Sequence, residues 1–431
     1  MLKIFGNQSN HCCDGWSRRN FLQVGSLGFA GLTLPNLLRT RALAAGTSEK
    51  SGQIKDKSVI WIWLSGGPTH VETFDPKMTA PSEYRSITGE CKTPIPGVTM
   101  GGTFPKMAAV ADKMALIRSF HHGTNSHGTG TTWVMTGHND RTGTKPSMGS
   151  ILSKALGTSN KKTGMPTYIG MGRIRSDGPG WLGARFSALD PRGQARKNMA
   201  LSVGSGRFTN RRTLLNGLDQ INRDIDRTGS MEGLDGFEQQ AFNLVLGKSQ
   251  EAFDINKEDK KTRERYGRGL GENLLLARRL CAEGCGFINV NYGGWDMHGK
   301  IAKSLKSRSP QMDQAISALI TDLDERGMLE DTLVVVTGEF GRTPRINKNA
   351  GRDHWGKLCT LALAGGGLQM GQVIGESSRK LEVPASNPVG PQDLLSTILV
   401  MFGLNHKLTF IDNSGRPTYM IENGRPIKEL I

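Results

Sequence analysis

The sequence is poor in cysteine and in aromatic residues, and it contains no internal repeat. Six cysteines are present in 431 residues, aromatic residues make up 6%, and no four-cysteine pattern of a metal site occurs. Zinc-finger spacings, RNA-binding motifs and dense basic helices are also missing, although the net charge is +16. Nucleic acid is therefore not an expected partner. A basic chain without these motifs favours small or polymeric anions as its partners.

The N-terminal segment resembles a twin-arginine export signal. The sequence SRRNFLQ at 17–23 precedes a moderately apolar run at 24–38, and Ala42-Leu43-Ala44 has the small-x-small form that signal peptidase cleaves. We interpret residues 1–45 as this signal, the alternative being a buried amphipathic helix with a chance pair of arginines. The apolar run is too short and too rich in glycine for a durable membrane span. The mature protein is therefore expected in the periplasm or secreted, without a stable membrane span.

After a polar linker at 46–57, apolar runs alternate with helical patterns through a domain at 58–431. Strands are expected at 58–64, 114–118, 286–290, 332–337 and 359–364, and helices at 104–113, 129–135, 148–156, 274–282, 311–327 and 392–402. Such an alternation predicts an α/β fold with a mostly parallel sheet covered on both faces.

The segment 157–272 has a weaker pattern and many arginines, and we interpret it as a basic insertion or cap within the domain. Its pieces PTYIGMG and GWLGARF are expected to be strand-like, and residues 214–265 helical. Cys281 and Cys285, at the end of an expected helix, either form a local disulfide after export or pack there as small residues, and we favour packing.

Histidines and carboxylates follow three of the expected strands. They are His70, Glu72, Asp75, Asp296, His298, Glu339, Asp353 and His354. Ligands of an open parallel sheet gather outside the carboxyl ends of the strands, so these side chains are expected to converge. Clustered carboxylates repel one another unless a cation neutralises them, and mixed shells of histidine and carboxylate suit zinc or manganese. Taken singly, each is more often a capping or hydrogen-bonded residue. Together they predict a metal or catalytic site.

The order of these motifs resembles the alkaline phosphatase/sulfatase superfamily. LVVVTGEFG at 333–341 resembles the strand end that carries an Asp-His pair in those enzymes, GPQDLLSTILVMFGL at 390–404 resembles a later helix, and Asp296-Met-His298 resembles a shortened Asp-x-x-x-His element. Within the superfamily, the motifs GGPTHVETFDPK, GWDMHGK, GEFGRTPR and GRDHWG are most similar to an exported bacterial family known as domain of unknown function 1501, whose members are commonly labelled sulfatase-like. The resemblance implies an alkaline-phosphatase-like three-layer sandwich with a basic cap.

The resemblance also implies which residues carry the chemistry, and here the sequence departs from it. The nucleophile of these enzymes stands nine positions before the Thr of a Thr-Gly pair, and counting back from Thr136 reaches His127. The predicted catalytic residues are therefore His127 and its neighbours Ser126 and Thr129. The Asp-His pair reads Glu339-Phe340, so one imidazole ligand is missing, and His70 or His127 is a possible replacement. One metal ion is the safer expectation, with a second left open.

The implied function is hydrolysis of phosphate or sulfate esters with a divalent metal, which is zinc, calcium or manganese. The substrate would be an anionic small-molecule or polysaccharide ester. Arg342 and Arg352 are predicted to hold the anion bidentately, the alternative being that they pair with the neighbouring carboxylates. The competing function is a catalytically lapsed protein that binds an anionic glycan or a partner protein through the retained pocket.

The export signal generates the first testable prediction. Replacing Arg18 and Arg19 by lysine should trap the precursor in the cytoplasm, because the twin-arginine pathway depends on that pair. Cell fractionation with immunoblotting checks this, and the unchanged protein should be released near Ala44 or Ala45. Normal export of the double variant through the general secretory route would contradict the interpretation.

Overall fold

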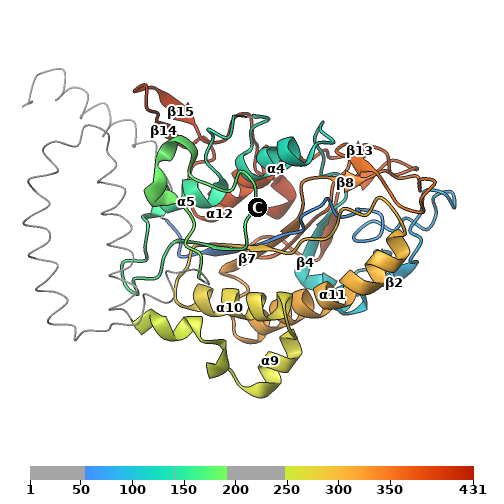
Figure 1. Cartoon of the computed structure of the whole chain (residues 1–431), viewed down its shortest axis with the longest axis horizontal. Helices are drawn as coiled ribbons and strands as arrows, with labels where there is room; N and C mark the ends of the chain where they lie inside the picture. The colour runs from blue at the N-terminus through green and yellow to red at the C-terminus, as the bar shows by residue number, and fades with distance from the viewer. Residues whose placement is uncertain (1–53, 141, 192–247) are drawn as a thin grey trace, which may run out of the picture. The chain divides into compact units, whose positions relative to one another are not determined.

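A seven-stranded sheet forms the centre of the protein, in the order β11-β4-β10-β7-β1-β6-β5 (Figure 1). The computed structural model describes residues 54–140, 142–191 and 248–431. The predicted signal at 1–45, most of the linker, and residues 192–247 of the predicted insertion lie outside the described residues. The expectations for those segments stay predictions.

Six of the seven strands run in the same direction. The strands are β1 Ser58–Trp63, β4 Met114–Ile117, β5 Tyr168–Met171, β6 Phe287–Asn291, β7 Thr332–Thr337, β10 Leu361–Gly365 and β11 Gln372–Ile374. Strand β10 is antiparallel to both of its neighbours, and every other pairing is parallel. The prediction of a mostly parallel sheet is confirmed.

The three central strands end at the same edge of the sheet. Trp63, the last residue of β1, is in register with Asn291 of β6 and Thr337 of β7. The loops that follow these strands therefore leave the sheet side by side. This shared edge brings together the polar motifs that are far apart in the sequence.

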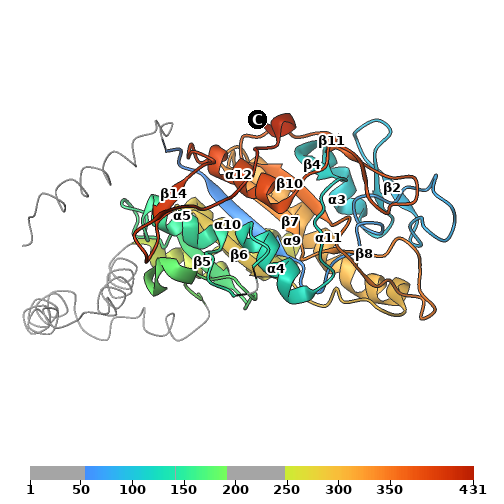
Figure 2. The same ribbon diagram turned by 90° about the horizontal axis from the view of Figure 1, so that it is seen from above.

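Helices cover both faces of the sheet, which makes a three-layer sandwich (Figures 1 and 2). Alternate residues of β1 point to opposite faces: Ile60 and Ile62 pack in the core beneath α3, α10 and α11, whereas Trp61 and Trp63 pack in the core beneath α4, α5 and α12. The helices are α3 Pro105–Ala109, α4 His127–Thr136, α5 Met148–Leu156, α9 Lys260–Tyr266, α10 Leu270–Ala282, α11 Ile301–Glu325 and α12 Pro391–Met401.

Short elements surround this sandwich. Four small hairpins pair β2 Glu90–Lys92 with β3 Thr99–Gly101, β8 Gly341–Arg342 with β9 His354–Trp355, β12 Glu376–Ser377 with β13 Pro384–Ser386, and β14 Thr409–Ile411 with β15 Pro417–Tyr419. The 3₁₀ turns are η1 Ala111–Lys113, η2 Gly180–Leu182, η3 Ala184–Phe186, η4 Lys248–Phe253, η5 Ile255–Lys257 and η6 Lys428–Leu430. Within the described residues, no helix combines the length and the apolar character that crossing a membrane requires.

Two local expectations were wrong. GWLGARF forms the turns η2 and η3 rather than a strand-like piece, because Gly183 between them has a φ of 100°, which interrupts an extended backbone. Helix α11 begins at Ile301, ten residues before the expected start, because Ile301 and Leu305 are fully buried and anchor its polar first turns in the core. Cys281 and Cys285 are free and buried, as packing requires, and burial raises the pKa of the Cys281 thiol to about 12.

One buried carboxylate ties together three helices on the same face of the sheet. Asp322 of α11 accepts hydrogen bonds from Arg265 and Tyr266 of α9, from Arg278 of α10 and from Arg326 of its own helix, at 2.7 to 3.0 Å. Its side chain is only 2% exposed. Burial acts to raise the pKa of Asp322, but the hydrogen bond from Arg326 and the charge of Arg278 outweigh it, so that this pKa is lowered.

This network generates a prediction for stability. Asp322→Asn should lower the free energy of unfolding by about 2–3 kcal/mol, because the buried Arg278 keeps only Glu258 as its counter-charge and Tyr266 loses its charged acceptor. Asp324→Asn, two residues away in an exposed pair with Lys113, is the matched control and should cost at most about 1 kcal/mol. Urea unfolding followed by circular dichroism measures both, and equal losses would contradict the assignment.

The same network predicts that the free energy of unfolding decreases at acid pH. A carboxyl whose pKa is lowered by folding stabilises the protein fully above its unfolded pKa, roughly 3.9 for aspartate. This contribution is lost as the pH falls through the lower folded value of Asp322. Asp322→Asn should therefore flatten the loss of stability below about pH 4. Melting temperatures recorded from pH 7 downward check this prediction.

Candidate metal centre

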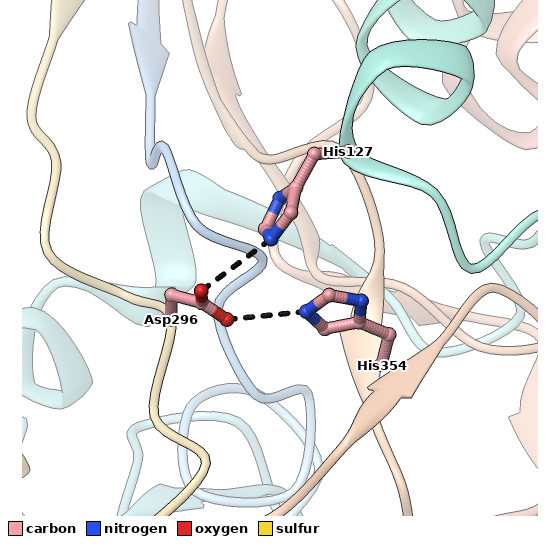
Figure 3. Close-up of side chains that lie close together, drawn as sticks. All are labelled: His127, Asp296 and His354. Carbon is pink, nitrogen blue, oxygen red and sulfur yellow. Dashed lines mark hydrogen bonds and ion pairs between the residues drawn. The ribbon is translucent and has the colours of Figure 1, made fainter.

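Side chains from four segments meet at the shared edge of the central strands, and Figure 3 shows three of them, those of His127, Asp296 and His354. Asp296 and His298 lie in the loop after β6, Glu339 lies in the loop after β7, His127 is the first residue of α4, and His354 is on β9. The structure therefore brings residues from two of the three predicted strand-end groups together with the residue found in the nucleophile register. Segments from across the whole described chain contribute to one cluster.

Asp296 lies at the centre of this cluster. Its Oδ1 is 3.0 Å from His298 Nε2 and 3.1 Å from His354 Nε2, and its Oδ2 is 3.5 Å from His127 Nε2. The two Nε2 atoms of His298 and His354 are themselves 2.9 Å apart. These side chains are between 22% and 49% exposed, so the cluster is open to a ligand from solvent.

The hydrogen bonds on the far side of each imidazole determine which nitrogen is protonated. His298 Nδ1 lies 2.8 Å from Asp353 Oδ1, His354 Nδ1 lies 2.9 Å from the carbonyl oxygen of Asn125, and His127 Nδ1 lies 2.7 Å from Glu339 Oε1. Carboxylate and carbonyl oxygens accept hydrogen bonds, so each Nδ1 donates. In the neutral imidazoles, Nε2 then carries a bare lone pair that faces Asp296.

This arrangement fits a metal ion. Donor atoms of His127, Asp296 and His354 all lie within 4.8 Å of one another. His298 Nε2, His354 Nε2 and Asp296 Oδ1 lie 2.9 to 3.1 Å from one another. Ligands of a tetrahedral zinc ion, at about 2.0–2.1 Å from the metal, lie roughly 3.3 Å from one another. Imidazoles oriented by a carboxylate or a carbonyl on the opposite nitrogen are typical of metal ligands.

Glu339 supports the cluster from a buried position. Its Oε1 accepts hydrogen bonds from His127 and from the backbone N–H of Gly66, at 2.7 and 2.8 Å. Its Oε2 is buried and has no hydrogen-bond partner among the described residues. The hydrogen bond to Glu339 raises the pKa of His127. An unpartnered buried carboxylate oxygen is costly, and a cation nearby would offset that cost.

Gly66 itself is required by this geometry. It has a φ of 115°, and a Cβ there would lie 2.4 Å from the backbone nitrogen of Asp296. Only glycine allows the loop after β1 to approach the loop after β6 this closely.

Arg342 holds the cluster together and is itself buried. It donates to the backbone carbonyls of Gly66, Gly67, Trp295 and Arg352, and its Nη2 lies 2.5 Å from Asp296 Oδ1. Burial acts to raise the pKa of Asp296, but the hydrogen bonds from Arg342 and His354 outweigh it and lower this pKa to about 2. Asp296 is therefore ionised. Arg342 was predicted either to hold the substrate anion or to pair with a neighbouring carboxylate, and this geometry matches the carboxylate pairing.

Four predicted site residues lie away from the cluster. Arg352 forms a fully buried ion pair with Glu72 at 2.7 Å, and its remaining donors bind backbone carbonyls. Asp75 accepts from Ser377 and lies 3.5 Å from Arg118. His70 contacts the carbonyl oxygen of Leu381, and burial lowers its pKa to about 4. These contacts lie within the protein interior. The candidate metal centre therefore does not include His70, Glu72, Asp75 and Arg352, for which metal and anion roles were predicted.

Asp353 lies one layer outside the converging nitrogens. Its Oδ1 accepts from His298 and from Asn347, and these hydrogen bonds, His298 first, lower its pKa. Asn347 and Asn125 were not foreseen as site residues. Asn125 lies within HHGTNSHGTG, beside the predicted catalytic residues, but the sequence carries no sign that its carbonyl orients His354.

Phe340 replaces the expected imidazole and forms an apolar wall of the site. Its ring centre lies 4.9 Å from that of His127 and 4.5 Å from that of His354. The side chain is fully buried. The position after Glu339 thus offers no ligand atom, and His127, a predicted replacement, comes from a different element.

Solved structures similar to this chain include several ester hydrolases. A sulfatase from a Pseudoalteromonas species is 13% identical over 86% of this chain and 71% of its own, with a TM-score of 0.40. A phosphonate monoester hydrolase from Silicibacter pomeroyi is 14% identical over 86% and 76%, with a TM-score of 0.38. The alkaline phosphatase TAB5 is 14% identical over 82% and 100%, with a TM-score of 0.36. These values are too low to transfer the activity of any of them.

Among curated proteins, none matches the sequence. A family model does match, and it covers residues 56–431, which is most of the chain and includes every residue of the cluster. Its description is "Protein of unknown function (DUF1501)". The chain therefore belongs to the DUF1501 family, as its four motifs predicted.

Proposed function

We propose that this protein is a metal-dependent hydrolase of phosphate or sulfate esters. The observation that carries the proposal is the convergence of the Nε2 atoms of His298 and His354, which are 2.9 Å apart, on Asp296 Oδ1 at 3.0 and 3.1 Å. Three possible ligand atoms at this spacing suit one shared cation. The ester class is supported by the order of the motifs, which resembles the alkaline phosphatase/sulfatase superfamily, and by the net charge of +16, which favours anionic substrates.

In this proposal His127, Asp296, His298 and His354 hold one divalent ion. Asp353 and Glu339 orient two of the imidazoles, and such outer partners also raise the basicity of the ligand. Three imidazoles and one carboxylate suit zinc better than calcium, because calcium prefers oxygen ligands. A bound ion would supply Lewis acidity to a non-bridging oxygen of the ester.

The attacking hydroxyl in this proposal belongs to Ser126. Ser126 is exposed and precedes the first residue of α4, and its side chain caps no backbone N–H. A helix N-terminus favours the negative charge that develops there. Thr129 is buried, which makes it the weaker candidate. Attack by Ser126 would form a phosphate or sulfate ester of the serine and release the alcohol, which takes up the proton of the hydroxyl. One water would then hydrolyse this seryl ester, which restores the serine and releases inorganic phosphate or sulfate.

We further place the mature protein in the periplasm or outside the cell. The support for this is the twin-arginine pattern at 17–23 and the small-x-small site at 42–44. Export by that route suits a folded protein that already carries its metal.

The metal centre can be tested without any substrate. The purified protein should contain about one divalent ion per chain, and His298→Ala or His354→Ala should abolish it, because each removes a ligand. Asp353→Asn should keep the fold and weaken binding by about 10- to 100-fold. Elemental analysis and competition with a chelator measure this. His406→Ala, a histidine outside the cluster, is the control and should keep its metal. Full metal content in His298→Ala and His354→Ala would contradict the proposal.

A second test separates the predicted roles of His127 and its neighbours. With an aryl phosphate and an aryl sulfate as substrates, Ser126→Ala should abolish turnover and keep the metal, and Thr129→Ala should retain turnover. His127→Ala should lose both metal and turnover. Loss of turnover with unchanged metal in His127→Ala would make it a catalytic group instead of a ligand. A metal-loaded wild-type protein that cleaves neither ester class would instead favour the binding protein of anionic glycans.

A further inference from the structure

A basic groove lies next to the candidate metal centre. It has a volume of about 840 Å³ and is lined by residues 173–180 together with Gly143 and Lys145. Sites for small ligands occupy roughly 300–1,000 Å³, so this volume accommodates a sizeable ligand. None of its lining residues belongs to the cluster around Asp296.

The positive charge of the groove comes mainly from two arginines that have no counter-charge. Arg173 and Arg175 are exposed, and within the described part of the chain neither guanidinium forms an ion pair or a hydrogen bond. Lys145 is partly neutralised by Glu422, which lies 3.7 Å away. This differs from the interior arginines, whose charges are paired.

The single acid of the groove does not cancel this charge. Asp177 turns inward, where its carboxylate accepts hydrogen bonds from Tyr168 and from Asn289, the latter at 2.6 Å. These contacts anchor the loop after β5 to the sheet. The anchored loop presents Arg173 and Arg175 on its outer side, so the site is built into the fold.

Three contacts place this loop against the candidate metal centre. A Cβ on Gly128, the residue after His127, would lie 3.1 Å from the guanidinium carbon of Arg175. Ser176 Oγ lies 2.7 Å from Thr132 Oγ1, one turn further along α4. Asn291, at the end of β6, donates to the carbonyl oxygen of Arg173 at 2.8 Å. The groove therefore begins where α4 presents His127.

We propose that Arg173 and Arg175 form a second anion-binding subsite, and that the substrate is a polysaccharide ester with at least two sulfate or phosphate groups. This inference rests on the proposed function for the reacting group and adds the class of substrate. One anionic group would lie at the metal centre, and a neighbouring group of the same chain would bind the arginine pair. Planar guanidinium groups bind such tetrahedral anions bidentately.

Low-mass dextran sulfate is a probe of this subsite, with unsulfated dextran of equal mass as its neutral counterpart. The wild-type protein should bind the sulfated polymer and not the neutral one. Arg173→Gln with Arg175→Gln should weaken binding by about tenfold or more, because charge-assisted hydrogen bonds are lost. Arg379→Gln with Arg416→Gln removes the same charge from exposed positions outside the groove and should change the affinity less than about twofold. Titration calorimetry measures binding, and circular dichroism confirms that the variants fold.

The experiment separates this inference from the proposed function. His354→Ala should lose metal and still bind dextran sulfate, and dextran sulfate should inhibit aryl-ester hydrolysis in the wild type more strongly than in the groove variant. If aryl esters are cleaved but binding of dextran sulfate is the same in the groove variant, the subsite is overturned and the hydrolase stands. If binding depends on the arginine pair but no ester is cleaved, the hydrolase fails and the anion site stands.

Discussion

The ion pair that the buried Arg342 forms with the half-exposed Asp296 is the contact on which the site depends. The guanidinium of Arg342 also donates hydrogen bonds to the carbonyl oxygens of Gly66 and Gly67 after β1, of Trp295 after β6, and of Arg352 just before β9. One side chain thus joins the loops that leave three neighbouring strands. A lysine would not reach these acceptors, because the planar fork of arginine presents five donors in fixed directions. The pair also keeps Asp296 ionised and aimed at the imidazoles.

The charges of Arg352 and Asp322 in the protein interior are paired. Arg352 pairs with Glu72, and Asp322 accepts four hydrogen bonds from α9, α10 and the C-terminal end of α11. By contrast, Glu339 Oε2 is buried and lacks a partner among the described residues, and the Nε2 atoms of His298 and His354 lie 2.9 Å apart. Buried polar groups are normally satisfied, and a cation bound beside this carboxylate oxygen would satisfy it.

The proposed metal centre and the proposed anion subsite would divide recognition of the substrate between them. Asp296 and the imidazoles offer lone pairs and suit a cation, whereas Arg173 and Arg175 offer only donors and suit an anion. The two adjoin at the start of α4, where the missing side chain of Gly128 leaves room for the guanidinium of Arg175. Interior arginines such as Arg342 already bind carboxylates and carbonyl oxygens. In the proposed subsite the substrate would instead contact Arg173 and Arg175, which lie on the loop after β5 and outside the four family motifs.

The sequence by itself determined the sheet and the residue types at its edge. Continuous apolar runs such as 332–337 are local signals, and parallel strands place their following loops at one edge regardless of tertiary detail. It did not distinguish His354, which faces the cluster, from His70, which faces Leu381, although both follow strands. Nor did it identify Arg175 or the carbonyl of Asn125. Only the tertiary structure decided these roles, because the direction of a side chain in a loop depends on contacts with segments remote in the sequence, whereas strand formation depends on its own residues.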